Sequence, residues 1–297
     1  MVHKSVLLQT SIEGLNIKKG DTFLDGTLGN GGHSKFVCEQ YGNDVKIIGL
    51  DAEEDAIARS RERLEKLKCP VTLVQSNFRN LDEVLEKLGL SSVDKILFDL
   101  GLSSNQFEES GRGFSFQKDE PLLMTFKNKT DENEITAKEI VNTWQEENLS
   151  AIIQGYGEER YARKIAKKIV EERKKKPIET TFELVRIVKE ATPKSYHHMK
   201  IHPATRTFQA IRIAVNDELG ALKDGLQKGF DKLSPGGRIA VISFHSLEDR
   251  IVKNFFRDKS KEQKAILITK KPIIPDEDEL RENPRSRSAK LRILEKK

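Results

Sequence analysis

The sequence has little cysteine and no long apolar run. Its two cysteines, Cys38 and Cys69, lack the C-x-x-C spacing of a zinc site and are too few for a disulfide framework. No stretch approaches the roughly 18 consecutive apolar residues of a membrane helix. The first residues also lack the apolar segment of a signal peptide. These absences predict a cytoplasmic protein in a reducing setting, with no metal and no membrane partner.

Neither positive nor negative charge dominates the sequence. The 297 residues contain 52 Lys and Arg against 47 Asp and Glu, which gives a net charge of +5 and an isoelectric point near 8.9. This mild excess permits a polyanionic partner without establishing one. A hydrophobic share of 36% and a charged share of 33% describe a soluble globular protein, and the length suggests about two domains.

Glycine, in contrast, is concentrated in residues 22–33, and the chain is organised around this stretch. A short apolar run ends in Asp25, four glycines follow within seven residues, and a helical pattern begins at Ser34. Strand, turn and helix in this order are the layout of a nucleotide-binding first βα unit. Glycine lets the backbone turn with φ > 0 and lets a ligand approach closely. An ordinary tight turn would look similar.

A second acid favours the cofactor interpretation. The apolar run 45–50 ends in Asp51, where doubly wound folds place a carboxylate for ribose hydroxyls. The pattern Gly29-Asn30-Gly31-Gly32 is not G-x-G-x-x-G, and the sequence has no G-x-x-x-x-G-K-[ST], which excludes a P-loop and argues against a dinucleotide site. Clustered glycines fit an adenosine cofactor without a pyrophosphate, such as S-adenosylmethionine.

The first hundred residues alternate strand and helix patterns, which predicts a parallel sheet with helices on both faces. The fourth strand is expected over 94–99, but the fifth only over 238–244. A βαβ crossover needs about a dozen residues, so the excess predicts an inserted domain, whose sequence is helical. Residues 207–226 are expected to form the helix that returns the chain to the sheet.

Polar residues follow the predicted strands and should line one crevice, because ligands of open parallel sheets lie outside the carboxyl ends. Asp25, Asp51 and Asp99 are the acids among them, and Phe78 follows the third strand. Phe78 is either a stacking partner for adenine or a core aromatic. His33 is either a ligand contact or a residue that starts a helix.

Asp99 opens a turn, residues 99–106, in which an acid can orient an amine. An exocyclic amine on a base is a poor nucleophile because its lone pair is delocalised into the ring. A carboxylate that accepts its N–H bond would localise this pair; the alternative role for Asp99 is a helix N-cap. His245 follows the fifth strand on the same rim, with Ser246 as the expected N-cap of the next helix.

Two segments are strongly basic. Residues 160–176 carry nine Arg and Lys, and residues 281–292 carry five. A charged helix face is usually only solvated, but two such segments favour a phosphate backbone as partner. Residues 194–202, with Tyr196 and three histidines, either add stacking contacts to RNA or form a flexible loop.

Seven longer stretches resemble the bacterial RsmH (MraW) family and cover nearly the whole chain in order. They are GGHS (31–34), DLGLSS (99–104), RGFSF (112–116), YGEER (156–160), TFQAIRIAVN (207–216), LSPGGRIAVISFHSLEDRIVK (233–253) and RENPRSRSAKLR (281–292). The resemblance implies an enzyme that uses S-adenosylmethionine to methylate N4 of a cytidine in the decoding region of 16S rRNA, within the small (30S) ribosomal subunit.

The resemblance also implies an α/β fold, the class I S-adenosylmethionine-dependent methyltransferase (Rossmann-like) sheet with a helical domain inserted after strand four. We expect the methyltransferase domain over 1–107 and 206–297, and the inserted substrate-recognition domain over 108–205. We assign catalytic roles to Asp99 and, from its position on the rim, His245. The cofactor contacts implied by the family are Gly31, Gly32, His33, Asp51, Phe78, Asp99 and Gln106.

The chain departs from the family pattern in two places. Ser5 stands where the family usually has Pro, and Leu123 and Thr125 stand where it has Asp and Arg. The second departure supports an alternative, an RNA-binding or ribosome-assembly protein that retains the fold. A nicotinamide-dependent oxidoreductase is a further alternative, against which the glycine spacing argues. A homodimer is one option for the oligomeric state.

Overall fold

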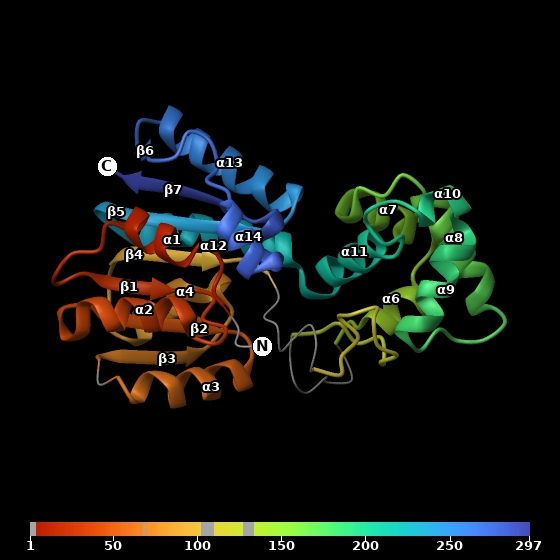
Figure 1. Cartoon of the computed structure of the whole chain (residues 1–297), viewed down its shortest axis with the longest axis horizontal. Helices are drawn as coiled ribbons and strands as arrows, with labels where there is room; N and C mark the ends of the chain where they lie inside the picture. Colours follow the sequence, from red (N-terminus) through yellow and green to blue (C-terminus); the bar gives the residue numbers. More distant parts are fainter. Residues whose placement is uncertain (1–3, 68, 102–109, 127–133) are drawn as a thin grey trace. The chain divides into compact units, whose positions relative to one another are not determined.

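The chain folds into two compact units (Figure 1). The computed structural model describes residues 4–67, 69–101, 110–126 and 134–297. Met1–Gly101 and Leu219–Lys297 form one unit, here called the sheet unit, and Leu102–Glu218 form the other, the helical unit. The helical unit is thus inserted after the fourth strand.

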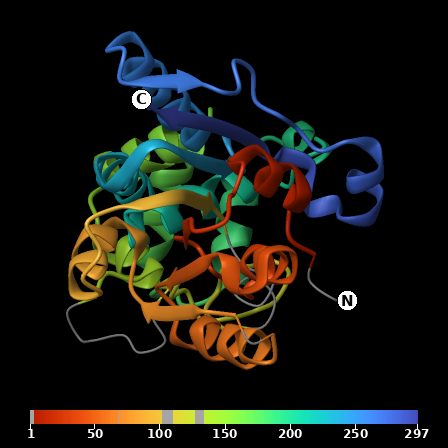
Figure 2. The ribbon, with the colours of Figure 1, turned by 90° about the vertical axis from the view of Figure 1, so that its left-hand side faces the viewer.

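Within its described residues, the sheet unit contains a sheet of seven strands in the order β3-β2-β1-β4-β5-β7-β6. β1 to β5 run parallel, whereas β7 runs antiparallel to β5 and β6; Figure 2 shows β7 beside β5. This is the order of the class I methyltransferase sheet, so the predicted fold class is confirmed. The strands are β1 (Thr22–Asp25), β2 (Lys46–Asp51), β3 (Val71–Gln75), β4 (Val93–Asp99), β5 (Leu233–Ser243), β6 (Ala265–Leu267) and β7 (Lys290–Lys296).

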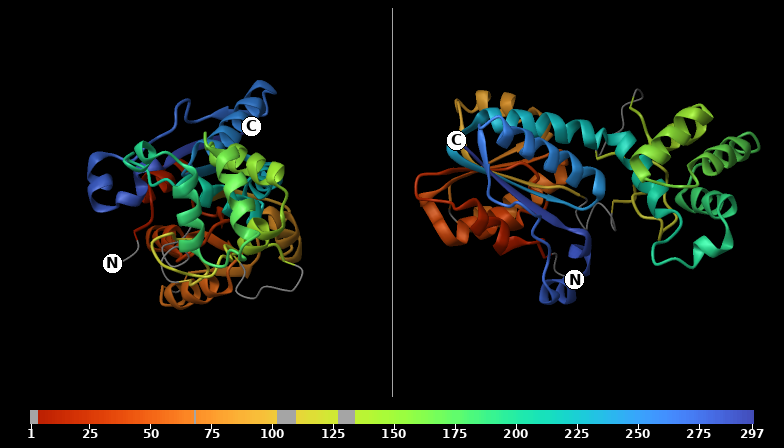
Figure 3. Two further views of the ribbon diagram at one scale, coloured as in Figure 1. Left: turned by 90° about the vertical axis from the view of Figure 1, so that its right-hand side faces the viewer. Right: turned by 90° about the horizontal axis from the view of Figure 1, so that it is seen from above.

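Helices cover both faces of this sheet (Figure 3, right). One core joins the sheet to α4, α12 and α13, with Phe98 among its buried residues. The other joins it to α1 and α2, with Phe23 among its buried residues, and α3 packs Leu64 against Leu28. The helices of this unit are α1 (Leu8–Leu15), α2 (Gly32–Tyr41), α3 (Glu54–Glu65), α4 (Leu81–Lys87), α12 (Glu218–Lys232), α13 (Ser246–Lys261) and α14 (Glu277–Glu282), with short 3-10 turns η1 (Gly42–Asp44), η2 (Phe78–Asn80) and η3 (Pro284–Ser288).

The helical unit has a core of its own. α8 buries Ile165 and Ile169, whose i, i+4 spacing places them on one face of the helix. α9 begins with a capping box, in which Thr180 and Glu183 bind each other's backbone N–H groups. Among the described helices of the chain, none combines the length and apolarity that crossing a membrane takes. The helices among the described residues of this unit are α6 (Ala137–Thr143), α7 (Glu146–Gly157), α8 (Ala162–Arg173), α9 (Thr181–Ala191), α10 (Lys194–His197) and α11 (Thr205–Asn216).

The segment that departs from the family motif is fixed inside the helical unit. Thr125 is buried, and Leu123 is half-buried. Between them, Met124 adopts φ +54; its N–H donates to the Arg112 carbonyl (2.7 Å), and its carbonyl accepts from the Asn216 amide (2.7 Å). These hydrogen bonds hold the segment without the Asp and Arg of the family.

Two elements differ from the prediction. The helix expected over 207–226 is broken at Asp217, which adopts φ +46 between α11 and α12. Because α11 packs Phe208 and Ile211 into the helical core, the second unit boundary falls at Glu218 and not at residue 205. β5 begins at Leu233 and not at the expected residue 238, and its register with β4 shifts between Leu233 and Arg238.

The two cysteines form a disulfide, which contradicts the expectation of unpaired cysteines in a reducing setting. Cys38 lies on α2, and Cys69 precedes β3; both belong to the core on one face of the sheet. They are 31 residues apart in the sequence, and the fold brings them together. Spacing alone therefore excluded a zinc motif but did not detect this pair.

The basic segment 281–292 is partly internal. Arg292 on β7 is buried, and its Nε and Nη2 donate to the two carboxylate oxygens of Asp249 at 2.7 and 3.3 Å. Lys290 Nζ lies 3.4 Å from the same carboxylate. Burial alone would raise the pKa of Asp249, but these two cations lower it overall. Arg292 therefore stabilises the sheet unit from within, whereas Lys290 pairs with the same carboxylate and stays partly exposed.

We predict that Arg292→Ala lowers the free energy of unfolding by about 3–5 kcal/mol, because it leaves Asp249 without its bidentate partner. Arg287→Ala is the matched control, since this exposed arginine of the same segment has no ion pair among the described residues. Its removal should change the free energy of unfolding by about 0.5 kcal/mol or less. Urea denaturation followed by circular dichroism compares the variants, and equal effects would contradict the internal role of Arg292.

Candidate active site

The candidate site lies at the carboxyl ends of β1 and β4, where the strand order reverses. The chain places β2 and β3 on one side of β1 and then returns to place β4 on the other. Such a switch point leaves a crevice outside the strand ends, in which open α/β sheets bind ligands. Asp25 pairs in register with Leu97, so β4 continues beyond the end of β1 to Asp99.

The glycine loop connects β1 to α2 and lies close against its neighbours. A Cβ on Gly26 would clash with the Phe98 ring, and a Cβ on Gly32 would clash with the Ser5 side chain. Gly31 adopts φ +69 at the start of α2, a conformation that side chains disfavour. The loop therefore needs glycine both for its path and for its close approach to other groups.

Three side chains of α3 fix this loop, and the sequence analysis did not identify them. The Ser60 hydroxyl donates to the Gly29 carbonyl (2.9 Å). Arg59 Nε donates to Asn30 Oδ1 (3.2 Å), and Arg63 Nη1 donates to the Asn30 carbonyl (3.1 Å). The partners are 29 to 33 residues apart in the sequence, so no local pattern announces these contacts.

Asp51 ends β2 and supports the same loop. Its Oδ2 accepts the Gly29 N–H (2.8 Å), and its Oδ1 accepts the Glu53 N–H (2.9 Å). Burial raises the pKa of Asp51, although these two hydrogen bonds oppose the rise. A carboxylate has about four lone-pair positions, so Asp51 keeps acceptor capacity for the ribose hydroxyls that the sequence assigns to it.

Asp25 is buried beneath the loop. The Ser34 hydroxyl donates to its Oδ2 (2.7 Å), and the Thr27 N–H donates to its Oδ1 (3.3 Å). Burial raises the pKa of Asp25 to about 6; these hydrogen bonds oppose the rise, and the charge of Asp51 adds to it. A buried acid with a raised pKa beside a crevice is typical of a functional site.

Asp99 has a carboxylate oxygen without a donor. Its backbone N–H donates to Thr27 Oγ1 (2.6 Å), but its Oδ1 is buried and has no hydrogen-bond partner among the described residues. Burial raises the pKa of Asp99 well above its ordinary value, and the charges of Asp25, Glu248 and Glu279 add to this rise. A buried acceptor without a donor costs free energy, so this oxygen points to a donor on a ligand.

His33 faces Asp99 from the start of α2. Its Nδ1 lies 3.8 Å from Asp99 Oδ2, and its Nε2 lies 3.3 Å from the Val6 carbonyl oxygen. The residue is buried in the first turn of the helix, so the helix-start interpretation holds. Because the ring also borders the site, the contact with the cofactor stays a prediction.

Phe78 packs as a core aromatic. Its ring centroid lies 5.0 Å from that of Phe98, and a Cβ on Gly225 would clash with it. The side chain is half-buried, so contact with adenine stays a prediction. Gln106, the last expected cofactor contact, lies outside the described residues.

His245 is the N-cap of α13, so the expected cap at Ser246 is wrong. The Glu248 N–H donates to His245 Nδ1 (3.4 Å), and the Glu248 carboxylate accepts the Phe244 and His245 N–H groups at 2.8 and 3.4 Å. His245 Nε2 lies 3.2 Å from Glu248 Oε1. The ring therefore has a structural role at the start of α13, and its catalytic role stays a prediction.

We predict that Asp25→Asn stabilises the free protein at neutral pH but not in acid. The pKa of Asp25 is raised to about 6, so the folded state binds this proton more tightly than the unfolded chain. Wild-type stability therefore falls as the pH rises from about 4 to about 6, by about 3 kcal/mol in total. The neutral amide of the variant removes this pH-dependent cost.

Urea denaturation at several pH values between 4 and 7.5 measures the difference between the variant and the wild type. Asp258→Asn, which removes an exposed carboxylate from the same unit, sets the baseline. A difference for Asp25→Asn that does not grow with pH would contradict the buried, ionised state of Asp25.

Comparison with known proteins gives the same assignment for the whole chain. The model of the MraW methylase family matches residues 1–297. Relatives named ribosomal RNA small subunit methyltransferase H include that of Brevibacillus brevis, 46% identical over 99% of this chain and 98% of its own. The relative of the same name from Clostridioides difficile is 46% identical over the same shares.

Among solved structures, a putative rRNA-methylase from Clostridium thermocellum is 16% identical, with a TM-score of 0.48 over 100% of both chains. An rRNA methylase from Streptococcus thermophilus is 13% identical, with a TM-score of 0.45 over 100% of this chain and 99% of its own. These structural likenesses are weak, and the assignment rests on the family model and the relatives. On that basis, the chain belongs to the MraW methylase family.

Proposed function

We propose that this protein transfers a methyl group from S-adenosylmethionine to N4 of a cytidine in the decoding region of 16S rRNA. The observation that carries the proposal is the buried Asp99 Oδ1 at the switch point, which has no donor among the described residues. Membership of a methylase family supports the reaction type. The names of the relatives support small-subunit rRNA as the acceptor.

The residues of the crevice fit S-adenosylmethionine. At Gly31 and Gly32 a Cβ would meet the side chains of Ser60 and Ser5, so these glycines allow close packing within the protein. Asp51 has acceptor capacity for a ribose, and His33 borders the same space. When bound, the cofactor supplies an electrophilic methyl group on a sulfonium, and the carboxylates of the crevice favour such a cation.

Asp99 acts on the acceptor amine. The N4 group of cytosine attacks poorly because its lone pair is delocalised, so a hydrogen bond from the amine to Asp99 Oδ1 localises this pair and orients it. The nitrogen loses one proton as its new bond to carbon forms. Since the pKa of Asp99 is well above its ordinary value, its carboxylate is a stronger proton acceptor than an exposed aspartate. Much of the remaining rate enhancement comes from holding the acceptor amine and the methyl group in the reactive orientation.

The helical unit is proposed to recognise the rRNA substrate, and the assembled small (30S) subunit is the proposed particle. A base must leave its stack to reach a pocket at the ends of buried strands. Contacts outside the target base are therefore needed to hold the surrounding RNA. The exposed basic residues of the helical unit that form no ion pair with a carboxylate among the described residues are the candidates for these contacts.

We predict that Asp99→Ala lowers kcat/KM for methyl transfer about 100-fold or more, because the amine loses its acceptor. Asp99→Asn keeps a carbonyl oxygen but cannot take up the proton, so its loss should lie between those of the wild type and the alanine variant. Asp258→Ala, in the same unit but exposed, should stay within about twofold of the wild type. The assay follows labelled methyl transfer to small subunits that lack the modification, with nucleoside analysis of the product.

Calorimetry with S-adenosylmethionine separates binding from chemistry, since Asp99 is also an expected cofactor contact. N4-methylcytidine made by the wild type and lost with Asp99→Ala at saturating cofactor supports the proposal. A wild type that binds the cofactor and methylates no small-subunit RNA would overturn it in favour of the RNA-binding alternative. Binding of a nicotinamide cofactor in place of S-adenosylmethionine would favour the oxidoreductase.

A further inference from the structure

The basic segment 160–176 consists of two parts, which differ in whether their cations form ion pairs. In the part from Lys167 onward, four of the six cations form ion pairs with glutamates, and Arg173 donates to the carbonyls of Val141 and Trp144. Lys175 and Lys168 together lower the pKa of Glu172 to about 2. The pairs are Lys167–Glu171 (4.0 Å), Lys168–Glu172 (3.0 Å), Lys168–Glu190 (3.2 Å), Lys175–Glu172 (2.8 Å) and Lys176–Glu183 (2.9 Å).

In the first part, residues 160–164, the cations are not neutralised by carboxylates among the described residues. Arg160, Arg163 and Lys164 are exposed, and none of them has an ion pair with a carboxylate among the described residues. The first turn of α8, to which Arg163 and Lys164 belong, contains no acid. Cations at this end of a helix are disfavoured by its dipole. The fold itself gives no reason for this unfavourable placement of two cations in the first turn of α8.

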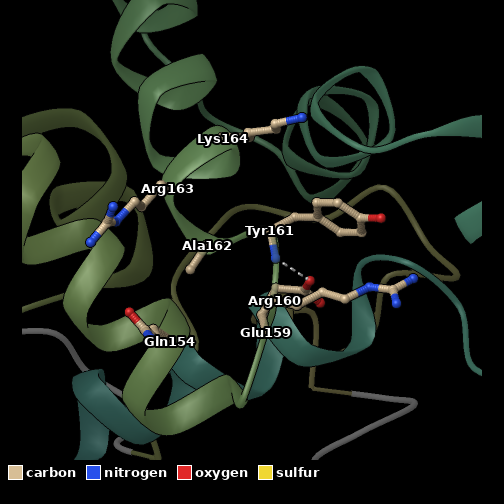
Figure 4. Close-up of a pocket in the computed structure, with 7 residues that line it drawn as sticks. All are labelled: Gln154, Glu159, Arg160, Tyr161, Ala162, Arg163 and Lys164. Atoms are coloured by element: carbon tan, nitrogen blue, oxygen red, sulfur yellow. Dashed lines mark hydrogen bonds between the residues drawn. The ribbon is translucent and has the colours of Figure 1, made fainter.

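These three cations line a cavity of about 400 Å³ (Figure 4). Figure 4 shows Arg163 pointing to the side of the turn opposite to Arg160 and Lys164. The cations therefore do not converge on one point, as they would around a small anion. The other lining residues are Gln154, Glu159, Tyr161 and Ala162.

Two tyrosines fix the Arg160 side of this cavity. The Arg160 guanidinium carbon lies 4.9 Å from the ring centroids of both Tyr161 and Tyr196, and Lys164 Nζ lies 5.9 Å from that of Tyr161. The two rings meet edge to face, with centroids 5.1 Å apart. Such a cluster of planar cation and aromatic side chains is typical of sites that hold unpaired bases.

Glu159 organises this cluster and does not neutralise it. The residue is buried; its Oε1 accepts the Tyr161 N–H (2.8 Å), and its Oε2 accepts the Tyr196 hydroxyl (2.6 Å). Burial and the bond to Glu159 raise the pKa of Tyr196 to about 12. Both carboxylate oxygens thus have donors, and the three cations keep a net positive charge around the cavity.

We propose that this cavity binds a single-stranded segment of the rRNA substrate away from the target cytidine. Arg163 and Lys164 contact phosphates on the two sides of the turn, and Arg160, held over the two tyrosines, contacts an unpaired base. An extended polyanion fits cations that project to two sides of a turn, whereas a free phosphate does not. The inference rests on the proposed function for the identity of the RNA, but its binding site consists only of residues of the helical unit.

The test is a pair of double variants with equal loss of charge. Arg163→Gln/Lys164→Gln removes two cations that line the cavity, and Lys167→Gln/Lys175→Gln removes two that are paired with glutamates. We expect the first pair to raise KM for the small-subunit substrate about tenfold while kcat and cofactor binding change less than about twofold. It should also flatten the dependence of log KM on log salt by about 0.7 for each lost phosphate contact. The control pair should leave both quantities near the wild-type values.

Fluorescence anisotropy with a single-stranded fragment of the decoding-region RNA repeats the comparison without catalysis, so the two proposals fail separately. Methylation by the wild type with equal KM and equal RNA affinity for both pairs would overturn this site and leave the proposed function intact. Absence of methylation together with a selective loss of RNA affinity in the Arg163/Lys164 pair would support the site and overturn the proposed function.

A third variant tests the base contact. Arg160→Gln removes the planar cation over the tyrosines, so we expect it to weaken binding of single-stranded RNA about fivefold and binding of a duplex of equal length less than about twofold. An equal loss on both RNAs would overturn the assignment of an unpaired base to Arg160. Displacement of the RNA by millimolar inorganic phosphate at constant ionic strength would overturn the choice of an extended polyanion over a small anion.

Discussion

Burial of carboxylates at adjacent strand ends is the constraint on which the rest of the sheet unit depends. Asp25 ends β1 and Asp99 ends β4, and burial is the largest cause of the raised pKa of each. Charges in such a place destabilise a fold unless their oxygens receive donors. Ser34 and the Thr27 N–H supply donors to Asp25, whereas Asp99 Oδ1 has none among the described residues. The buried Oδ1 of Asp99 thus destabilises the folded protein, and a hydrogen bond from a bound amine would offset this loss of stability.

The strands and their terminal acids could be predicted because their signals are local. A buried parallel strand is a short apolar run, and the acid that follows each run marks the rim of the sheet; Asp25, Asp51 and Asp99 all lie where this rule places them. The requirement for glycine at positions 31 and 32 is equally local, since it reflects the backbone conformation and the close approach of neighbouring side chains. The sequence therefore predicted the first four parallel strands and the acids at their carboxyl ends.

The features that sequence reasoning missed depend on partners far along the chain. Arg59 and Ser60 look like ordinary helix residues, but they hold the glycine loop. Arg292 looks like part of a basic surface, but it is buried against Asp249. The break at Asp217 depends on α11 packing with the helical core, which helical periodicity alone does not show.

Among their described residues, the two units carry charged side chains of opposite sign that a ligand of the opposite charge would stabilise, and this contrast supports one function for the chain. In the sheet unit, Asp99 and Asp25 are acids in a crevice with raised pKa values, which a cation such as a sulfonium favours. In the helical unit, Arg160, Arg163 and Lys164 are cations without carboxylate partners among the described residues, although the rest of the same basic segment is largely neutralised by glutamates. A charged side chain that the fold does not pair, although neighbouring charges are paired, lowers stability. Such a side chain is expected where a ligand supplies the opposite charge. A cationic cofactor and a polyanionic substrate are the two ligands that a methyltransferase of RNA must bind.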